Sequence, residues 1–493
     1  MIVLSELLSA INKKTKTYRN KVITRVCHDS RTTDADAVFV CIRGALVDGH
    51  AYALSAYNRG CRVFVCEREP DLPSDALILT VPETRKALAE LSAKLYDYPH
   101  KKLRIIGVTG TKGKTTTALL IRHMLNENGI PTGYIGSNGI DYGDVHIEPI
   151  NTTPESGDLQ RYMHLMVEAG IKCLALEISS QALFMYRVHG LSFDTCIFTN
   201  LAHDHIGEHE HPTFEHYRDC KHALFTDYGM EYALYNGDDP HAAFMMTGCR
   251  AKQREPFSQN ADAPYRATDI GLFRKGTRLG CRFTCTLPDG RLSLTLPIPG
   301  DFNVYNATAA LAVCHRMGLT HEQIAHSMST ARIQGRFETV DALPDVTFVL
   351  DYAHNGVSLT SALRTLRLYE PTRLICLFGS VGGRTEMRRP ELGRAAASLA
   401  DFCILTSDNP DREPPERIID QIALQFGDDT CPYIKITDRA KAIEYAVNMA
   451  EPGDIVLLAG KGHEDYQLIC GRKEPFSERN LILSAADAKK LLI

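Results

Sequence analysis

The sequence lacks any uninterrupted apolar run of about 18 residues, the length that a membrane-spanning helix requires. Its first stretch, MIVLSELLSAINKKTKTYRN, has no basic segment ahead of an apolar one and no cleavage-site pattern, so no export signal is expected. Internal repeats and low-complexity tracts are missing as well. We therefore expect a cytoplasmic protein built from ordinary globular domains.

No strong excess of charge is present either. The formal net charge of -5 offers no general case for binding nucleic acid or a membrane surface. The 15 cysteines are scattered, and none forms a CxxC pair or a zinc-finger spacing. An odd number of scattered cysteines indicates reduced thiols, as in the cytosol. Hydrophobic residues make up 44% and charged residues 23% of the chain, which is typical of a soluble protein.

The 493 residues are too many for one hydrophobic core, and their patterns divide into three blocks. Residues 1–102 mix short strand-like runs with helical stretches and predict a small α/β domain. Residues 103–332 predict a mainly parallel sheet with a P-loop-type strand, turn and helix, capped by Gly129, and a hairpin series at 265–298 that turns at Asp289–Gly290. Residues 333–493 alternate strands and helices, which predicts a doubly wound, Rossmann-like domain.

The stretch GVTGTKGKTTT, residues 107–117, lies between a predicted strand and a predicted helix. Its glycines allow backbone N–H groups to turn toward an anion, and the start of the helix adds its dipole. Lys114 is placed to reach terminal phosphates, and the Thr115 hydroxyl to bind Mg²⁺. The spacing GxxGKT departs from the general GxxxxGK[ST] pattern, but the flanking elements favour an ATP site over an ordinary glycine-rich turn. The predicted ATP-binding residues of this loop are Gly110, Thr111, Lys112, Gly113, Lys114, Thr115 and Thr116.

A second stretch, residues 200–222, contains six histidines and five acidic residues. Alone it suggests zinc, and a histidine-rich zinc-binding regulator is one alternative. A closed zinc site needs spacings such as H-x₃₋₅-H beside a cysteine pair, and that pair is missing. Because Mg²⁺ prefers oxygen ligands, we interpret the stretch as part of a magnesium-phosphate site completed by the upstream loop. The histidines expected on the surface or in a substrate pocket are His203, His209, His211, His216 and His222.

Taken in order along the chain, the motifs resemble those of the Mur ligase family, the ATP-dependent amide ligases of peptidoglycan precursor synthesis. The loop TGTKGKTTT is preceded by HDSR and DGH and followed by NTTPE, EISSQAL, TNLAHDH, YRDCKHALF, GDFNVYNATAA, DYAHN, DNPDRE and AGKGHEDYQ. HDSR, DNP and GKGHEDY resemble the branch that adds the third peptide residue, the tripeptide synthetases. The resemblance spans essentially the whole chain. It implies a UDP-sugar-binding N-terminal domain, an ATP-binding central domain and an amino-acid-binding C-terminal domain.

The activity that this resemblance implies is the addition of a diamino acid to UDP-N-acetylmuramoyl-L-alanyl-D-glutamate by a monomeric enzyme. ATP would phosphorylate the substrate carboxylate, and the amine would then displace phosphate from the acyl phosphate. The implied catalytic residues are Lys114, Glu177, His205 and Lys221, and the last three, with Thr115, would serve two Mg²⁺ ions. Lys221 stands where the family carries a lysine carbamylated by CO₂, a modification that requires a neutral amine.

The remaining implied contacts fall into three groups. Those to ATP are Asn303, Asn306, Arg336, Asp351 and His354. Those to the UDP-sugar-peptide are Ser30, Asn151, Thr152, Thr153, Ser179 and Arg187. Those to the incoming amino acid are Arg384, Asp408, Asn409, Asp411, Gly460 and Glu464.

The identity of the amino acid depends on the motif SDNPDRE. Members of this branch that use meso-diaminopimelate typically carry DNPR, whose arginine holds the distal carboxylate. Here Asp411 takes that place, and an aspartate would repel a carboxylate but accept an ammonium. We therefore predict L-lysine, with meso-diaminopimelate as the alternative if Arg412, one residue later, restores the clamp. Further alternatives are a P-loop kinase or NTPase, a non-catalytic relative, and a folylpolyglutamate-type or cyanophycin-type ligase.

Overall fold

The computed structural model describes residues 1–44, 47–204, 206–207, 210–383, 386–428 and 430–491. They form two compact units, one of residues 1–266 with 308–320 and one of residues 267–307 with 321–493. Within the described ranges, no helix combines the length and apolar character that crossing a membrane requires. The boundaries at residues 102 and 332 stay a prediction.

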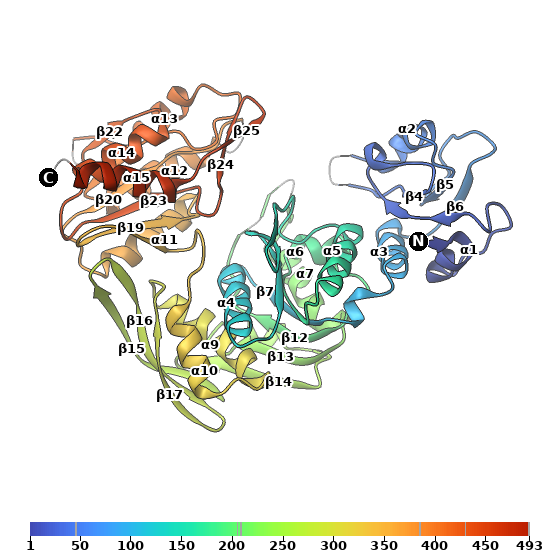
Figure 1. The fold of residues 1–493 in the computed structure, drawn as a ribbon, viewed down its shortest axis with the longest axis horizontal. Coiled ribbons are helices and arrows are strands. Elements are labelled where there is room, and N and C mark those ends of the chain that lie inside the picture. Colours follow the sequence, from blue (N-terminus) through green and yellow to red (C-terminus); the bar gives the residue numbers. More distant parts are fainter. Residues whose placement is uncertain (45–46, 205, 208–209, 384–385, 429, 492–493) are drawn as a thin grey trace. The chain divides into compact units, whose positions relative to one another are not determined.

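The first unit begins with a small parallel sheet that carries a core on each face (Figure 1). Its order is β3-β4-β5-β6, after a two-stranded pair of β1 (Ile2–Val3) and β2 (Val22–Ile23). Alternate residues of β4 face opposite sides, so Val38 packs with helix α3 and Phe39 with helix α2. The bounds are α1 Leu4–Leu7, β3 Arg25–Cys27, β4 Ala37–Val40, α2 Ala53–Asn58, β5 Val63–Cys66, β6 Leu77–Thr80 and α3 Thr84–Leu95.

A larger sheet forms the rest of the first unit, in the order β10-β9-β8-β11-β7-β12-β13-β14. The six strands from β8 to β14 are parallel, as predicted, and the short β9 and β10 add an antiparallel edge. Because parallel strands point the same way, the segments after β7, β11 and β12 leave the sheet at one edge. The strand bounds are β7 Arg104–Thr109, β8 Thr132–Gly136, β9 Gly139–Tyr142, β10 Val145–Ile147, β11 Cys173–Glu177, β12 Phe193–Phe198, β13 Met230–Asn236 and β14 Gln253–Ser258.

Helix α4 follows β7 directly and packs against β7, β8 and β11. It ends at Glu127, and Gly129 has the left-handed backbone (φ 74°) predicted for it as the cap residue. Helix α4 spans Lys114–Glu127. The other helices of this unit are α5 Ser156–Glu168, α6 Ser180–Phe184, α7 Phe214–Asp227 and α8 Ala242–Met245. Helix α9 (Phe302–Arg316) belongs in part to each unit.

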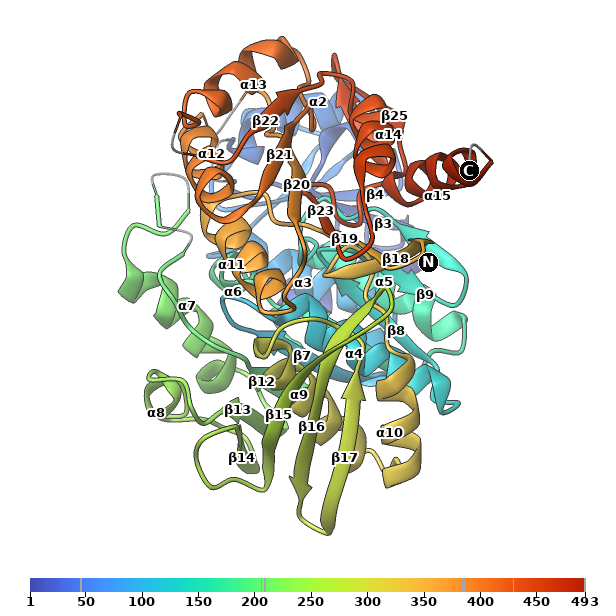
Figure 2. The same cartoon turned by 90° about the vertical axis from the view of Figure 1, so that its left-hand side faces the viewer.

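The predicted hairpin series is present as β15 (Tyr265–Lys275), β16 (Arg278–Leu287) and β17 (Gly290–Leu296), whose long ribbons are clear in Figure 2. Leu287 pairs with Gly290, so the two-residue loop is Pro288–Asp289. The prediction of a turn at Asp289–Gly290 was wrong by one residue, because Gly290 is already the first paired residue of β17. Helix α10 (His321–Thr330) packs on β17.

The second unit contains a six-stranded sheet in the order β18-β19-β23-β20-β21-β22, parallel except for β18. Because β23 lies between β19 and β20, the right-handed connections place α11, α12 and α13 on one face and α14 on the other. Helices α14 and α15 share one core on that second face. This is the predicted doubly wound, Rossmann-like fold.

The bounds in this unit are β18 Glu338–Leu343, β19 Val346–Asp351, α11 Gly356–Arg367, β20 Leu374–Phe378, α12 Arg388–Leu399, β21 Phe402–Leu405, α13 Pro415–Ala423, β22 Tyr433–Lys435, α14 Arg439–Met449, β23 Ile455–Ala459, β24 Tyr466–Ile469, β25 Arg472–Pro475 and α15 Glu478–Lys490.

Candidate active site

The glycine-rich loop, residues 110–113, leaves the carboxyl end of β7 and is held by the segments that follow the neighbouring strands. Thr109 donates its hydroxyl to the carbonyl oxygen of Ile178 at 2.9 Å. After β12, Thr199 donates to the carbonyl of Lys112 at 2.7 Å, and the Asn200 amide both accepts from the Lys112 N–H and donates to its carbonyl. The loop is therefore fixed before any ligand arrives.

Two backbone conformations in this loop require glycine. Gly110 and Gly113 have φ values of 148° and 87°, and a Cβ on Gly110 would lie only 2.0 Å from Thr199 Oγ1. Helix α4 begins immediately after Gly113, and in the described chain no side chain caps this helix end. A loop of this shape at an uncapped helix N-terminus has the geometry that can bind a phosphate group.

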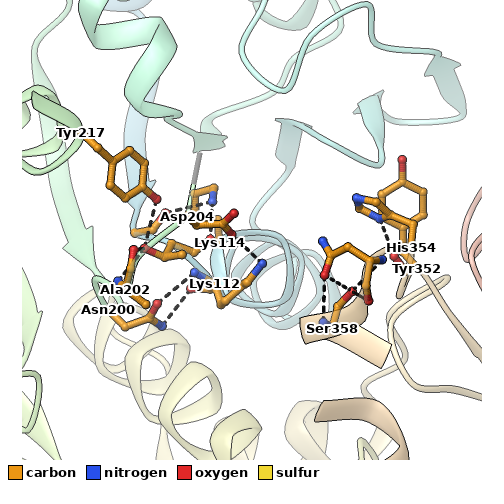
Figure 3. Close-up of polar contacts among 12 residues, drawn as sticks. Lys112, Lys114, Asn200, Ala202, Asp204, Tyr217, Tyr352, His354 and Ser358 are labelled. Atoms are coloured by element: carbon orange, nitrogen blue, oxygen red, sulfur yellow. Dashed lines mark hydrogen bonds and ion pairs between the residues drawn. The ribbon is translucent and has the colours of Figure 1, made fainter. Parts of the chain in front are cut away.

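The side-chain nitrogens of two lysines meet at the carbonyl of Gly110. Lys114, which Figure 3 shows, donates to the carbonyls of Gly110 and Thr111 at 2.9 and 3.0 Å. Lys221, from α7, donates to the same Gly110 carbonyl at 2.9 Å. Lys221 is only 1% exposed. Burial lowers the pKa of Lys221 well below its ordinary value, and the charge of Lys114 lowers this pKa further.

Lys112, in the same loop, has an acidic partner. Its ammonium pairs with Asp204 at 2.8 Å, as Figure 3 shows. Asp204 belongs to the histidine-rich stretch, so the structure brings that stretch to the phosphate loop. His205 lies outside the described residues, and its predicted role stays a prediction.

Glu177 ends β11 beside this loop and is fully buried (0% exposed). Its carboxylate accepts hydrogen bonds from the Tyr134 hydroxyl and from the backbone N–H of Ser137 at 3.1 Å. A Cβ on Gly136 would lie 2.2 Å from Glu177 Oε1, so that close approach requires glycine. Sequence reasoning selected Glu177 but missed Tyr134 and Gly136, which hold its carboxylate in one orientation.

The segment of residues 151–155 packs on the chain that follows Glu177. Thr153 donates to the Glu177 carbonyl at 2.8 Å and accepts from the Ser179 N–H at 3.2 Å. Arg187 donates to the Thr153 carbonyl, and Thr152 lies 3.0 Å from the Ser137 hydroxyl. Four of the predicted sugar-peptide contacts, Thr152, Thr153, Ser179 and Arg187, are thus joined through hydrogen bonds; the structure gives no such contact for Asn151.

A carboxylate between two arginines links this region to the N-terminal sheet. Glu155 pairs with Arg187 at 2.9 Å and with Arg85 at 3.0 Å, and Arg85 also donates to the Arg43 carbonyl. Sequence reasoning missed Glu155 and Arg85, although the residue after NTTP was available as a signal. In the N-terminal sheet itself, Ser30 lines a cavity of about 480 Å³ together with His28, Arg31 and Tyr52.

In the second unit, Arg336, Asp351 and His354 gather at the carboxyl end of β19. The Arg336 guanidinium lies 5.0 Å from the centre of the Tyr352 ring, and the His354 Nδ1 donates to the Tyr352 carbonyl, drawn in Figure 3. Burial raises the pKa of Asp351, which Arg336 opposes, and burial lowers the pKa of His354. Both shifts therefore come first from the burial of this group of residues.

Asn303 and Asn306 lie in the first turns of α9, and both are buried. Asn303 donates to the Pro299 carbonyl at 2.6 Å, and Asn306 donates to the Asn303 side-chain oxygen at 2.9 Å. These contacts fix the start of the helix, so a structural contribution is present beside the predicted contact with ATP.

The carboxyl ends of β21 and β23 bring three polar residues together around a buried ammonium group. Lys461, which is 0% exposed, donates to Asn409 at 2.9 Å and to Glu464 at 3.1 Å, and it lies 3.6 Å from Asp408. Gly460 has φ 114°, and a Cβ there would lie 2.7 Å from Asp408 Oδ2. Two carboxylates against one lysine leave a negative charge, which suits a cationic ligand.

Sequence reasoning selected Asp408, Asn409, Gly460 and Glu464 but missed Lys461, although it stands within the GKGHEDY motif. Burial raises the pKa of Glu464, and the nearby charge of Asp408 raises this pKa further.

Asp411, the residue on which the lysine prediction rests, is hydrogen-bonded to the β24–β25 hairpin. Its carboxylate accepts from the Gly471 N–H at 2.7 Å, and its own N–H donates to the Leu468 carbonyl at 2.9 Å. One oxygen of the Asp411 carboxylate is therefore occupied by a hydrogen bond from the hairpin. Arg384 lies outside the described residues. Arg389, in α12, is buried and pairs with Glu413 at 2.7 Å.

Among the described histidines of residues 200–222, from which His205 and His209 are excluded, His211 differs from expectation. His203 is exposed and stacks on Phe214, but His211 is fully buried. The expectation of a surface position was wrong for His211. Its side chain is buried between α6 and α7, where Nε2 lies 2.8 Å from the Ser180 hydroxyl.

Comparisons with known proteins agree along the whole chain. Family models match residues 22–96 (Mur ligase family, catalytic domain), 108–314 (Mur ligase middle domain) and 335–462 (Mur ligase, glutamate ligase domain). The UDP-N-acetylmuramoyl-L-alanyl-D-glutamate--2,6-diaminopimelate ligase of Caldanaerobacter subterraneus subsp. tengcongensis is 35% identical, over 97% of this chain and 98% of that protein. The ligase of the same name from Chlorobaculum tepidum is 40% identical, over 94% and 92%.

Solved structures show the same likeness. A UDP-N-acetylmuramoyl-L-alanyl-D-glutamate--2,6-diaminopimelate ligase is similar with a TM-score of 0.71 and 27% identity, over 99% of this chain and 100% of that one. Mycobacterium tuberculosis folylpolyglutamate synthase shares the fold, with a TM-score of 0.60 and 14% identity over 82% and 95%. The similarity to the diaminopimelate ligases thus extends to sequence, whereas the similarity to the folate enzyme is one of fold.

Proposed function

Since the chain belongs to the Mur ligase family and is a ligase, we propose that it joins meso-diaminopimelate to UDP-N-acetylmuramoyl-L-alanyl-D-glutamate at the expense of ATP. Relatives that cover nearly the whole chain carry the name of that activity. One observation carries the chemistry: Lys114 and the buried Lys221 both donate to the Gly110 carbonyl of a preformed phosphate loop. These contacts support a proposal in which both lysine side chains act beside the phosphates of ATP.

In this proposal the loop binds the β- and γ-phosphates of ATP through its N–H groups, and Lys114 accompanies the phosphoryl group as it moves. The γ-carboxylate of the acceptor attacks the γ-phosphate, which gives an acyl phosphate and ADP. The amine of the diamino acid then attacks the acyl carbon, and phosphate leaves. Thr111, Lys112, Thr115 and Thr116 line the nucleotide, with Asn303, Asn306, Arg336, Asp351 and His354 of the second unit proposed as further contacts.

Magnesium fits the donors that the structure places around the loop. Glu177 offers a buried and oriented carboxylate, and Thr115 offers a hydroxyl at the first turn of α4. Hard oxygen donors of this kind are the ligands that Mg²⁺ selects. We propose that Thr115, Glu177, His205 and Lys221 hold the magnesium ions, which would neutralise phosphate charge during transfer.

Lys221 supplies oxygen donors only after a covalent change. A neutral amine is nucleophilic toward CO₂, and the carbamate that forms carries two oxygens and a negative charge. The lowered pKa of Lys221 supports this step, because burial and Lys114 both favour the neutral amine over the ammonium.

The acceptor is proposed to bind with its UDP end in the Ser30 cavity and its sugar-peptide end along Asn151, Thr152, Thr153, Ser179 and Arg187. The cavity volume of about 480 Å³ is of the size that a nucleoside would occupy. The Arg187–Glu155–Arg85 chain would keep the N-terminal domain and the peptide-binding segment in one register.

For the amino acid, we propose Arg412 as the partner of the distal carboxylate, in place of the earlier expectation that Asp411 selects lysine. The full-length relatives favour diaminopimelate, and the Asp411 carboxylate is engaged by Gly471. Arg412 is exposed, and its Nη2 lies near Gly471. Asp408, Asn409, Gly460 and Glu464, with Lys461 and Arg384, would hold the α-amino and α-carboxyl groups.

Substituting Arg412→Ala is expected to lower kcat/KM for meso-diaminopimelate by about 10–100-fold, the range for losing a charge-assisted hydrogen bond. The rate with L-lysine should change little, since lysine has no distal carboxylate. The measurement is ATP turnover with each amino acid in turn. Arg394→Ala, which removes an exposed arginine of α12, is the matched control. Faster turnover of the unmodified protein with lysine than with diaminopimelate would instead restore the lysine prediction.

A further inference from the structure

Three metal-ligating side chains meet between α6 and α7: His211, His216 and Cys220. One ligand atom from each lies within 4.8 Å of the other two. His211 Nδ1 is 2.8 Å from His216 Nδ1, and Cys220 Sγ is 3.8 Å from the same His216 atom. None of these residues takes part in the proposed ligase chemistry.

The chain presents these ligands in a fixed way. His216 and Cys220 are four residues apart on α7, the spacing that places two side chains on one face of a helix. His211 is fully buried, and its second ring nitrogen, Nε2, lies 2.8 Å from the Ser180 hydroxyl. Metal-binding histidines usually donate the other ring N–H to such a partner, which fixes the ring and leaves Nδ1 for the metal.

The distances are close to those of a bound cation. Zinc binds histidine nitrogen at about 2.0–2.1 Å and cysteine sulfur at about 2.3 Å, so tetrahedral geometry separates two nitrogens by about 3.3 Å and nitrogen from sulfur by about 3.6 Å. The observed distances of 2.8 and 3.8 Å lie on either side of these values. Two Nδ1 atoms at hydrogen-bond distance share one proton between them. A bound cation would replace that proton.

We propose that His211, His216 and Cys220 bind a zinc-like divalent cation at a site distinct from the magnesium-phosphate site. A thiolate with two imidazoles selects soft or borderline cations and is a poor site for Mg²⁺. Three protein ligands leave a fourth position for water, so the cation is exchangeable.

Such a cation would tie together two elements that carry the proposed active site. Ser180, the partner of His211, begins α6 directly after the Glu177–Ser179 segment, and Cys220 precedes Lys221 on α7. Binding of zinc therefore stabilises the contact between α6 and α7, by an amount that grows with zinc concentration.

The test uses the full chain, stripped of metal and kept in excess Mg²⁺, to which Co²⁺ is added as a spectroscopic probe for zinc. The unmodified protein is expected to bind one equivalent and to show the near-ultraviolet charge-transfer band of a cobalt–thiolate bond, which Zn²⁺ then abolishes. Cys220→Ser should lose this band, and His216→Ala should weaken Zn²⁺ affinity at least about 10-fold. His222→Ala and Cys249→Ser, from the same region, should behave as the unmodified protein.

The readout is metal binding, so it is independent of the ligase proposal. Thermal unfolding in the absence of metal shows whether each variant is folded, and Zn²⁺ should raise Tm in the unmodified protein but not in Cys220→Ser. Absence of the thiolate band from the unmodified protein, or its persistence in Cys220→Ser, would overturn the site.

Discussion

Substituting Lys221→Met is expected to lower kcat by about 10³-fold, the scale for losing one preorganised charge at a phosphoryl-transfer site. The methionine keeps the buried stem, so the loss is one of charge and carbamate oxygens rather than of packing. Incubation with ¹³C-bicarbonate and carbon NMR should show a carbamate signal in the unmodified protein and none in the variant. Lys252→Met, at a surface lysine paired with Glu231, is the control.

The carbamate signal also has a predicted pH dependence. Only the neutral amine reacts with CO₂, and burial with Lys114 lowers the pKa of Lys221. The signal and the activity should therefore persist to a lower pH than an ordinary lysine would allow, and should fall together as the pH drops below the lowered pKa. A variant that retained activity within a few-fold, or a signal that persisted without Lys221, would contradict the role.

The second large effect is expected from Lys114→Met, which should lower kcat by about 10³-fold because the charge that follows the phosphoryl group is lost. Lys172→Met is the control. It removes an exposed lysine at the amino end of β11, whereas the loop lies at the carboxyl end of the sheet, and it should leave kcat unchanged. A loss smaller than about 10-fold in Lys114→Met would contradict the phosphate-loop assignment.

The two lysines should also fail to act independently. Since the Lys114 charge lowers the pKa of Lys221, removing it favours the ammonium form of Lys221 and should weaken the carbamate signal at neutral pH. The double variant is then expected to be little slower than either single variant, because groups that work as one unit have non-additive effects. Lys114→Arg, which retains the charge, should keep the carbamate signal.

Sequence reasoning succeeded where the pattern itself has a local physical cause. The strand, glycine turn and helix at residues 104–127 are such a case, because Gly110 and Gly113 adopt backbone conformations that only glycine takes easily. The doubly wound sheet is another, since alternating buried strands and amphipathic helices leave few other arrangements. The hairpin turn was misplaced because Asp289–Gly290 is a strong local signal, while the register is set by pairing along the whole of β16 and β17.

Long-range contacts account for what sequence reasoning missed. Tyr134 and Glu177 are far apart in sequence but lie on adjacent strands, and Lys461 meets Asn409 only because β21 and β23 end at one edge. The zinc alternative was set aside for lack of a cysteine pair. His211 and His216 nevertheless have the H-x₄-H spacing, and the fold brings Cys220 to them from the same helix.

The central claim, an acyl-phosphate ligase that uses both substrates in one site, is tested most directly with an acceptor labelled with ¹⁸O in the glutamate γ-carboxylate. The full chain is incubated with ATP, Mg²⁺, this acceptor and meso-diaminopimelate. The masses of the nucleotide-linked product and of the released phosphate are then measured by mass spectrometry. The account predicts the diaminopimelate-containing tripeptide and one ¹⁸O atom in each phosphate released. Phosphate without the label, or phosphate released equally well without acceptor and amino acid, would contradict it.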